Sequence, residues 1–306
     1  MQLSESSVFT TLITDLDNTL WDWSATWLAS FGALLDAASA LSGVPPGVLR
    51  AEAQVVHRRV GTVEYSFLLD ELPSLLAASH GQRPSVAYRQ AIESSRAARS
   101  REFRVYPRVD QALRAAKGAG ILIVGLTESL GYWTQWRIRT AGLDGVFDRV
   151  YSGPDHDFPP GVTRNAVRSR PEASYGLHLT KHVELPQGFC KPDVRVLASI
   201  LEDIHVRREG ALYVGDSLVR DVQMAKQAGL TVAWARYGVA SLARNDLLHA
   251  VSHWPQSAKA PVDEGGCIQP DFVLETGFEE ILPILGVRDG WPEDHCRVRG
   301  RGESEI

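Results

Sequence analysis

The order of apolar and polar residues predicts one strand followed by a long helical region. Residues 9–14 form a short apolar run with β-branched residues, which is typical of a buried strand. From residue 24 onward apolar residues recur at helical spacing, until SGVPPG at 42–47 interrupts the helix. Further helices are predicted over 48–60, 63–78 and 86–101. Residues 22–104 therefore resemble a helical insertion with no predicted strand.

After this insertion the pattern alternates between strands and helices. Strands are predicted over 121–126, 148–152, 211–214, 231–235 and 271–274. Helices are predicted over 109–119, 129–140, 193–204, 219–228 and 278–285. Such alternation is typical of a parallel sheet that is covered by helices. We therefore expect an α/β protein with a Rossmann-like parallel sheet as its core.

Three segments show no regular period. Residues 153–189 carry Pro, His and Arg without a pattern, and residues 255–270 are rich in Pro, Gly and Ala. A long structureless stretch is unusual in a compact domain, so we interpret both as irregular insertions that are functional or mobile loops. The tail 291–306 is predicted to be flexible. In GPDHDFPPG at 153–161 the consecutive Asp-His-Asp residues favour a loop over a metal site, because adjacent residues rarely converge on one ion.

Composition narrows the class of protein without identifying it. The 306 residues carry 32 basic and 37 acidic side chains, which gives a net charge of −5. Because basic residues are not in excess, the composition does not indicate a nucleic-acid partner. Three cysteines, Cys190, Cys267 and Cys296, lie far apart in the sequence and indicate a reducing compartment. No signal peptide is recognised, and no apolar run approaches the ~20 residues of a membrane span. We therefore expect a cytoplasmic protein that does not bind a membrane.

Six polar side chains suited to phosphate chemistry lie at predicted strand ends or at the start of a helix. Ligands of an open parallel sheet gather at the carboxyl ends of its strands, so these side chains are expected to meet there: Asp15, Asp17, Thr127, Lys191, Asp216 and Asp221. Four carboxylates suit Mg²⁺, which binds a few carboxylates, water and substrate phosphate. The hydroxyl and the ammonium are suitable partners for phosphate oxygens.

The spacing of Asp15 and Asp17 requires an explanation, because two ionised carboxylates so close together repel each other when they lose water. A cation would remove this conflict. A reaction that needs one carboxylate charged and the other protonated would also remove it. The structural alternative is that an Asp pair after a strand forms a turn or caps a helix.

Four short motifs give these residues a common context. DLDNTLWD at 15–22, LT at 126–127, KPD at 191–193 and GDSLVRD at 215–221 resemble, in order, the four motifs of the haloacid dehalogenase-like (HAD) hydrolase superfamily. The insertion resembles the helical cap domain common in that superfamily. The resemblance implies a catalytic core of residues 1–21 and 105–290, a cap of residues 22–104 and a flexible tail of residues 291–306.

The resemblance also implies roles for the acidic residues. Asp15 would be the nucleophile that forms an aspartyl-phosphate. Asp17 would be the general acid and then the base that activates water. Mg²⁺ would be bound by Asp15, by the backbone carbonyl of Asp17 and by Asp216. Asp221 would support the metal or the lysine from outside the coordination shell.

The phosphoryl group would be held by Thr127 and Lys191, which would offset its growing charge. Family members often have Asn-Gly after this threonine, whereas Glu128 and Ser129 follow it here. Glu128 would bring a negative charge near the phosphate, so it points away, contacts the substrate or weakens turnover. The gap from Thr127 to Lys191 is also longer than the family pattern predicts.

Tryptophans are concentrated in two places. Trp21, Trp23 and Trp27 lie where the chain enters the insertion, and we expect them to pack the hinge and the cap. A stacking wall for an aromatic or sugar substrate is the alternative. Trp133 and Trp136 lie on the helix after Thr127 and are predicted to be core residues.

The function implied by the resemblance is Mg²⁺-dependent hydrolysis of a small phosphomonoester through an aspartyl-phosphate. A phosphomutase, which uses the same residues but returns the phosphoryl group to the substrate, is one alternative. A weakly catalytic binding or regulatory protein on the same fold is another. A dehalogenase is disfavoured because carbon–halogen displacement does not call for Asp17. The residues of the cap select the substrate, and no motif there identifies it.

Overall fold

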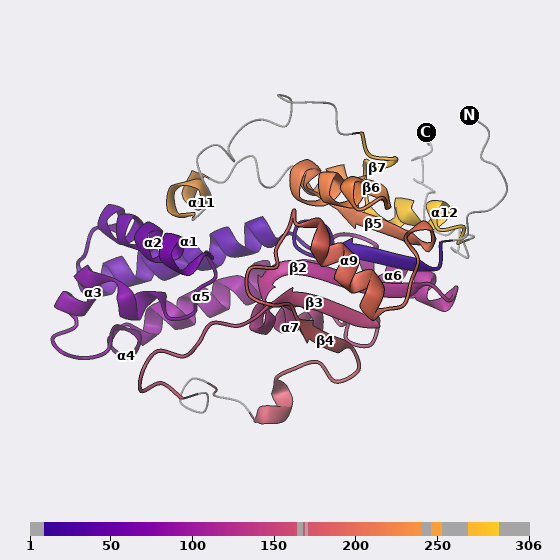
Figure 1. Cartoon of the computed structure of the whole chain (residues 1–306). Helices are drawn as coiled ribbons and strands as arrows, with labels where there is room; N and C mark the ends of the chain where they lie inside the picture. The colour runs from indigo at the N-terminus through magenta and orange to yellow at the C-terminus, as the bar shows by residue number, and fades with distance from the viewer. Residues whose placement is uncertain (1–8, 164–167, 169–170, 240–245, 253–268, 288–306) are drawn as a thin grey trace, which may run out of the picture.

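A parallel β-sheet lies at the centre of the computed structural model (Figure 1). The structure describes residues 9–163, 168, 171–239, 246–252 and 269–287. Over these residues the sheet has seven strands: β1 (Thr11–Asp15), β2 (Leu122–Leu130), β3 (Arg149–Gly153), β4 (Lys181–Glu184), β5 (Ala211–Gly215), β6 (Thr231–Ala235) and β7 (Phe272–Leu274). Their order is β4-β3-β2-β1-β5-β6-β7, and all neighbouring strands are parallel. The predicted α/β fold with a parallel sheet is confirmed.

The topology places the end of β1 where the strand order changes direction. β1 pairs with β2 on one side and with β5 on the other, and all five of its residues are buried. The strands β2 to β4 continue in one direction and β5 to β7 in the other. Ligands of open α/β sheets bind outside the carboxyl ends of the strands at such a switch point. The fold therefore directs a ligand to the residues that follow β1.

Helices cover both faces of the sheet. Leu12 belongs to one apolar cluster and Ile13 to the other, as the alternation of side chains along a strand requires. The first cluster includes residues of α6 (Val109–Gly118), α7 (Gly131–Thr140), the 3₁₀ turn η7 (Phe278–Glu280) and α12 (Ile281–Ile284). The second includes residues of α9 (Val194–Asp203), the π-helix η4 (Leu218–Gln223) and α10 (Met224–Gln227). Two further 3₁₀ turns are η2 (Glu172–Ser174) and η3 (Arg208–Gly210).

The chain between β1 and α6 is helical and lies to one side of the sheet (Figure 1). It comprises α1 (Trp23–Ser42), α2 (Pro46–Val60), η1 (Leu68–Glu71), α3 (Pro73–Ala78), α4 (Pro84–Ala87) and α5 (Arg89–Glu102). Asp22 caps α1 by accepting a hydrogen bond from the backbone N–H of Ala25 at 2.9 Å, and Gly43 ends the helix with φ of 75°. α11 (Asp246–Val251) packs on α2, where Nδ1 of His57 donates to the carbonyl of Val251 at 2.9 Å. The predicted helical insertion is confirmed.

The prediction of one continuous helix over 63–78 is wrong. Residues before η1 form turns, and Leu72 is extended, with φ of −82° and ψ of 114°. The cause is Pro73, which has no N–H to donate and disfavours helical geometry in the preceding residue. Pro73 instead begins α3, because a proline fits the first turn of a helix.

Two predictions near the sheet are also wrong. β2 continues to Leu130, so Ser129 lies in this strand and not in a helix, and α7 begins at Gly131. The β2–β3 register shifts between Leu126 and Leu130, which is an irregularity of the β-bulge type. Strand β4 lies within 153–189, where no element was predicted, because this short edge strand is polar and only partly buried. The tail 291–306 and most of the 255–270 loop fall outside the described residues.

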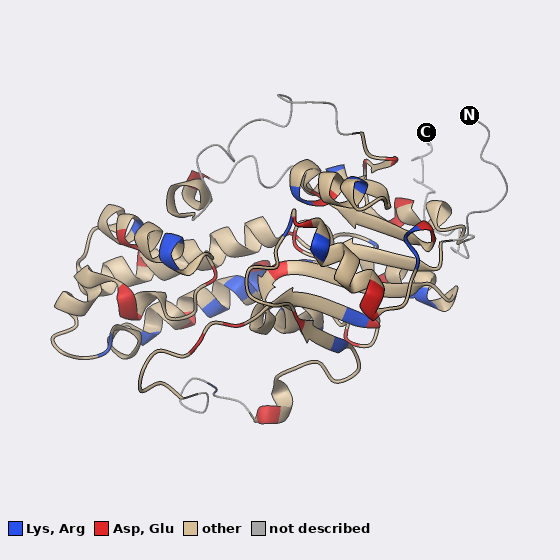
Figure 2. Cartoon of the chain, viewed as in Figure 1, with Lys and Arg blue, Asp and Glu red and all other residues tan. Residues whose placement is uncertain are grey.

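Charged residues of both signs are interspersed over the sheet layer and the insertion (Figure 2). Several form exposed ion pairs one helical turn apart, such as Arg89 with Glu93 and Arg114 with Asp110. Such pairs contribute little to stability, so the fold depends on its apolar clusters. None of the helices in the described ranges combines the length and the apolar composition that a membrane span requires.

The insertion offers a matched test of this packing. Leu75 and Leu76 are neighbours in α3, but Leu75 is 0% exposed and Leu76 is 48% exposed. Leu75→Ala should lower the free energy of unfolding by about 2–5 kcal/mol, because it leaves a cavity in a packed cluster. Leu76→Ala should change it by less than about 1 kcal/mol. Urea and thermal unfolding of the two variants measure the difference, and equal losses would show that α3 does not pack as described.

Candidate active site

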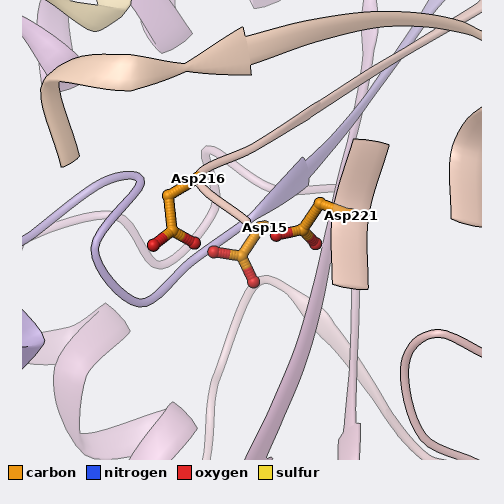
Figure 3. A group of neighbouring side chains, drawn as sticks. All are labelled: Asp15, Asp216 and Asp221. Atoms are coloured by element: carbon orange, nitrogen blue, oxygen red, sulfur yellow. The ribbon is translucent and has the colours of Figure 1, made fainter. Parts of the chain in front are cut away.

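Three buried carboxylates meet at the carboxyl ends of β1 and β5 (Figure 3). One oxygen each of Asp15, Asp216 and Asp221 lie within 4.8 Å of one another. Asp15 ends β1, Asp216 follows β5, and Asp221 lies in the π-helix η4. Parallel pairing of β1 with β5 therefore joins residues about 200 positions apart in the sequence. Among the Asp, Glu, His and Cys residues that the structure describes, these three aspartates form the group whose ligand atoms lie close enough together to hold a metal ion.

Lys191 lies against this carboxylate triad. Its buried ammonium forms ion pairs with Oδ1 of Asp15 and, at 2.7 Å, with Oδ1 of Asp221. The hydroxyl of Tyr213 donates to the same oxygen of Asp221 at 2.7 Å, and the backbone N–H of Ser217 donates to its other oxygen at 3.0 Å. Asp221 is thus held by three donors, which fixes the position of the lysine between the two aspartates.

The charges of this cluster do not balance by themselves. Three carboxylates face one ammonium, and burial raises the pKa of Asp15 to about 7 even though Lys191 opposes this shift. Burial and the neighbouring carboxylates of Asp15 and Asp221 also raise the pKa of Asp216 well above its ordinary value. A hard divalent cation fits this donor set, because it prefers carboxylate oxygens and would compensate the surplus negative charge.

The local sequence explains how β1 leads into this site. Asn18 has φ of 61°, a left-handed conformation that asparagine tolerates better than most residues. Its side chain accepts from the N–H and the hydroxyl of Ser24 at 3.1 Å, which ties the turn to the start of α1. Thr19 donates to Oδ2 of Asp15 at 2.9 Å. A Cβ at Gly215 would clash with the side chain of Asp221, so the glycine of the GDS motif allows this carboxylate to approach β5.

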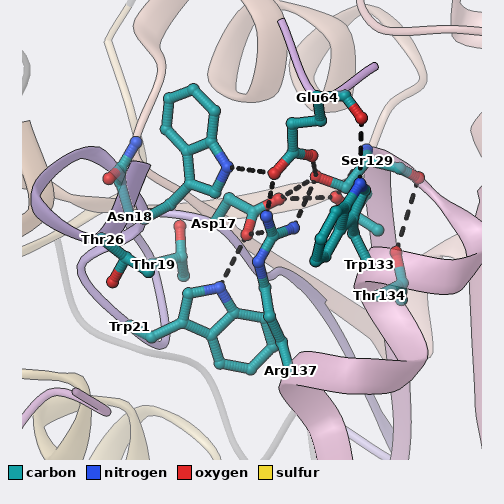
Figure 4. Close-up of polar contacts among 12 residues, drawn as sticks. Asp17, Asn18, Thr19, Trp21, Thr26, Glu64, Ser129, Trp133, Thr134 and Arg137 are labelled. Carbon is teal, nitrogen blue, oxygen red and sulfur yellow. Dashed lines mark hydrogen bonds and ion pairs between the residues drawn. The ribbon is translucent and has the colours of Figure 1, made fainter. Parts of the chain in front are cut away.

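Asp17 lies outside the triad, in a second polar cluster (Figure 4). Oδ1 of Asp17 accepts from the indole N–H of Trp21 at 2.6 Å. Oδ2 accepts from the hydroxyls of Thr127 at 3.1 Å and Ser129 at 2.6 Å. Nη1 of Arg137 lies 3.4 Å from Oδ1. The six predicted site residues therefore form two groups, with Asp15, Lys191, Asp216 and Asp221 in one and Asp17 and Thr127 in the other.

Three residues of this second cluster were not predicted from the sequence: Glu64, Ser129 and Arg137. Arg137 forms an ion pair with Glu64, and the hydroxyl of Ser129 lies 3.0 Å from Oε2 of Glu64. Burial disfavours the charge of Arg137, but Asp17 and Glu64 outweigh this effect and raise the pKa of the guanidinium. The sequence signal that could have identified Arg137 is its place on the buried face of α7, beside Thr134 and Ile138, where a charged residue needs a partner.

The residue after Thr127 has a definite partner. Glu128 forms an ion pair with Arg220, which lies in the π-helix η4 of the fourth motif, and both side chains are partly exposed. The guanidinium compensates the negative charge of Glu128. Asp155, His156 and Asp157 follow β3 in a segment without helix or strand, so the predicted loop is confirmed.

The tryptophans pack largely as expected. Trp21, Trp23 and Trp27 are buried, and the rings of Trp23 and Trp27 stack with centroids 6.2 Å apart. Trp133 and Trp136 are only partly buried; Trp136 packs against the larger apolar cluster, but Trp133 belongs to neither cluster, so the prediction that both are core residues holds only in part. They lie where α7 faces the insertion, and the guanidinium of Arg99 from α5 lies 4.2 Å from the ring centroid of Trp133.

Comparisons with known proteins agree with this architecture. A HAD family hydrolase from Xanthomonas campestris aligns with a TM-score of 0.52 and 13% identity, over 92% of this chain and 97% of that chain. A 2-haloacid dehalogenase from Pseudomonas syringae aligns with a TM-score of 0.50 and 19% identity, over 90% and 97%. The magnesium-bound putative HAD-hydrolase YfnB from Bacillus subtilis aligns with a TM-score of 0.50 and 15% identity, over 91% and 99%. At these identities the likeness concerns the fold.

The sequence comparisons are more specific about the family. A search of curated proteins gave no match. The sequence model for haloacid dehalogenase-like hydrolases matches residues 9–229, which include both polar clusters and the whole helical insertion. Because this match spans most of the chain, the protein belongs to the haloacid dehalogenase-like hydrolase family.

Proposed function

We propose that this hydrolase is a Mg²⁺-dependent phosphatase that cleaves a small phosphomonoester through an aspartyl-phosphate on Asp15. The observation that carries the proposal is the buried triad of Asp15, Asp216 and Asp221 with Lys191 against it. This arrangement offers a nucleophile, a cation site and an ammonium for phosphoryl oxygens in one place. The second cluster supplies a separate carboxylate, Asp17, for proton transfer.

The residues present fit a magnesium ion. Asp15 and Asp216, with the backbone carbonyl of Asp17, would hold it, and Asp221 would support Lys191 and the ion from the adjacent position. When bound, Mg²⁺ would offset the negative charge of the phosphoryl group during transfer. The structure of the YfnB hydrolase from Bacillus subtilis contains magnesium, which supports this choice of ion.

In the first step a carboxylate oxygen of Asp15 attacks phosphorus. An oxygen–phosphorus bond forms on Asp15 while the bond to the leaving oxygen breaks, and Asp17 gives a proton to that oxygen. Lys191 and Thr127 would hold phosphoryl oxygens during the transfer. In the second step Asp17 takes a proton from water, the water oxygen bonds to phosphorus, and the bond to Asp15 breaks to release phosphate.

We further propose that residues 22–104 act as a cap over the core of residues 1–21 and 105–290 and exclude water from the reaction. The substrate would be a small phosphorylated molecule. The ion pair of Glu128 with Arg220 answers the electrostatic objection to efficient turnover, because the charge of Glu128 is compensated. Release of inorganic phosphate from a panel of phosphorylated metabolites would identify the substrate, and an isomerised product without phosphate release would indicate a phosphomutase instead.

The proposed metal site can be tested by removing the ion and by substituting one of its ligands. Activity on 4-nitrophenyl phosphate should disappear with a chelator and return with Mg²⁺. Asp216→Asn should lower activity at least about 100-fold, because it removes a charged ligand. Asp110→Asn is the control, since Asp110 lies on α6 in an exposed ion pair and should leave activity unchanged. Full activity of metal-free protein would contradict the proposal.

The pH dependence of metal binding should follow the acidity of the triad. Burial raises the pKa of Asp15 to about 7, so this carboxyl keeps its proton at lower pH and must lose it when a cation binds. The apparent affinity for Mg²⁺ should therefore fall as pH decreases from 8 to 6. Thermal stabilisation by added Mg²⁺ measures this affinity without a substrate, and an affinity that rises at lower pH would be inconsistent with the assignment.

Substitutions of Asp15 and Asp17 should block different steps of the reaction. Asp15→Asn removes the nucleophile, so no phosphoenzyme should form with any substrate. Asp17→Asn keeps the nucleophile but removes the proton donor, so an alkyl phosphate should not react. An activated aryl phosphate needs less help from an acid, so rapid mixing should give a burst near one product per site, followed by slow turnover. Near-normal steady turnover of both substrates by Asp17→Asn would rule out its role.

A further inference from the structure

A buried ion pair joins the helical insertion to the cluster around Asp17 (Figure 4). Glu64 belongs to the turn between α2 and η1, whereas Arg137 lies on α7 of the core, 73 residues later. The side chain of Glu64 is 9% exposed and that of Arg137 is 5% exposed. Burying two charges to this degree is costly unless they are paired, so this ion pair links the insertion to the core.

Glu64 is anchored on both sides of this contact. The indole N–H of Trp23 in α1 donates to its Oε1 at 3.0 Å, which holds the carboxylate within the insertion. The indole N–H of Trp133 in α7 donates to its backbone carbonyl at 3.0 Å, and the hydroxyl of Ser129 in β2 lies 3.0 Å from Oε2. The position of Glu64 is therefore set by the insertion and by the core together.

Arg137 divides its guanidinium between two carboxylates. Nη2 pairs with Glu64, while Nη1 lies 3.4 Å from Oδ1 of Asp17 and donates to the hydroxyl of Ser129 at 2.9 Å. Glu64 and Asp17 are the ion-pair partners of Arg137 within the described residues. If Glu64 lost its charge, the guanidinium would have Asp17 as its remaining carboxylate and would draw it into a direct pair.

Ser129 connects the same two carboxylates. Its oxygen lies 2.6 Å from Oδ2 of Asp17 and 3.0 Å from Oε2 of Glu64, and it accepts from Arg137. A hydroxyl carries one hydrogen, so its direction depends on both carboxylates. Loss of Glu64 would therefore change the donors on both oxygens of Asp17.

We propose that Glu64 is a positioning residue for Asp17. It holds Arg137 and Ser129 in place, so that the carboxyl of Asp17 stays oriented for proton transfer to and from the substrate. Because Glu64 comes from the insertion, the acid–base group is set correctly only while the insertion is docked on the core. This inference rests on the proposed phosphatase function, in which Asp17 is the acid and base.

The inference predicts a selective defect in the steps that need proton transfer. Phenyl phosphate has a poor leaving group that needs protonation, whereas 4-nitrophenyl phosphate has a good one. In Glu64→Gln, the rate of phosphoenzyme formation from phenyl phosphate should fall roughly 10–100-fold, part of the ~10²–10⁴ that positioned proton transfer contributes. The rate of the nitrophenol burst should change less than about threefold, whereas steady turnover of both substrates should slow together, because Asp17 also activates water in the shared hydrolysis step.

A matched control comes from the insertion itself. Glu52 in α2 accepts from the N–H and the hydroxyl of Ser74, so it stabilises the insertion, and among the described residues its hydrogen bonds stay within the insertion. Glu52→Gln should therefore leave the ratio of the two rates of phosphoenzyme formation unchanged. Glu64 acts through Arg137, so the two substitutions should not add. The double variant Glu64→Gln with Arg137→Gln should form the phosphoenzyme less than about threefold more slowly than Arg137→Gln alone.

The outcomes separate this inference from the proposed function. Wild-type protein that forms no phosphoenzyme with 4-nitrophenyl phosphate would overturn both. Wild-type protein that forms it, with a Glu64→Gln variant in which phosphoenzyme formation slows equally from both substrates or from neither, would overturn the positioning role alone. If Glu64→Gln does not fold, Ser129→Ala removes the bridge without leaving a charge unpaired, and it should show the same selective loss. An unselective Ser129→Ala would then overturn the inference.

Discussion

The structure depends on how acidic side chains can be buried at the end of the central strand. Asp15, Asp216 and Asp221 lie together away from water, and the ammonium of Lys191 compensates only part of their charge. Burial of carboxylates without compensation is costly, so the surrounding elements all supply donors or space for this cluster. Tyr213 and the N–H of Ser217 hold Asp221, and Gly215 leaves room for it. The remaining surplus of negative charge supports the proposed cation site at this edge of the sheet.

The second polar cluster meets the same constraint with a different cation. Asp17 and Glu64 share the guanidinium of Arg137, and Ser129 links the two carboxylates. Asp15 and Asp17 are two positions apart in the sequence, yet one side chain is paired with a lysine and the other with an arginine. This separation gives two neighbouring carboxylates different surroundings, which is the condition for giving them different chemical roles.

Predictions from the sequence succeeded where a local pattern carries the information. β1 and β5 are short apolar runs that are buried from both sides, and the motifs at their ends need particular residue types in a fixed order. Predictions failed where a local pattern is weak or where one residue overrides it. β4 is a polar edge strand that needs β3 beside it to exist, and Pro73 divides a stretch that is otherwise periodic like a helix.

The sequence by itself determined the class of the fold and the helical insertion, because the spacing of apolar residues indicates both. It also identified the six candidate site residues, because short motifs contain them. Only the tertiary structure decided that the side chain of Asp17 lies apart from the carboxylate triad. It also decided that Glu128 pairs with Arg220 and that Glu64 pairs with Arg137. An ion pair between residues 73 positions apart leaves no periodic signal along the chain. It forms because folding brings two buried charges to the same place, where each removes the cost of burying the other.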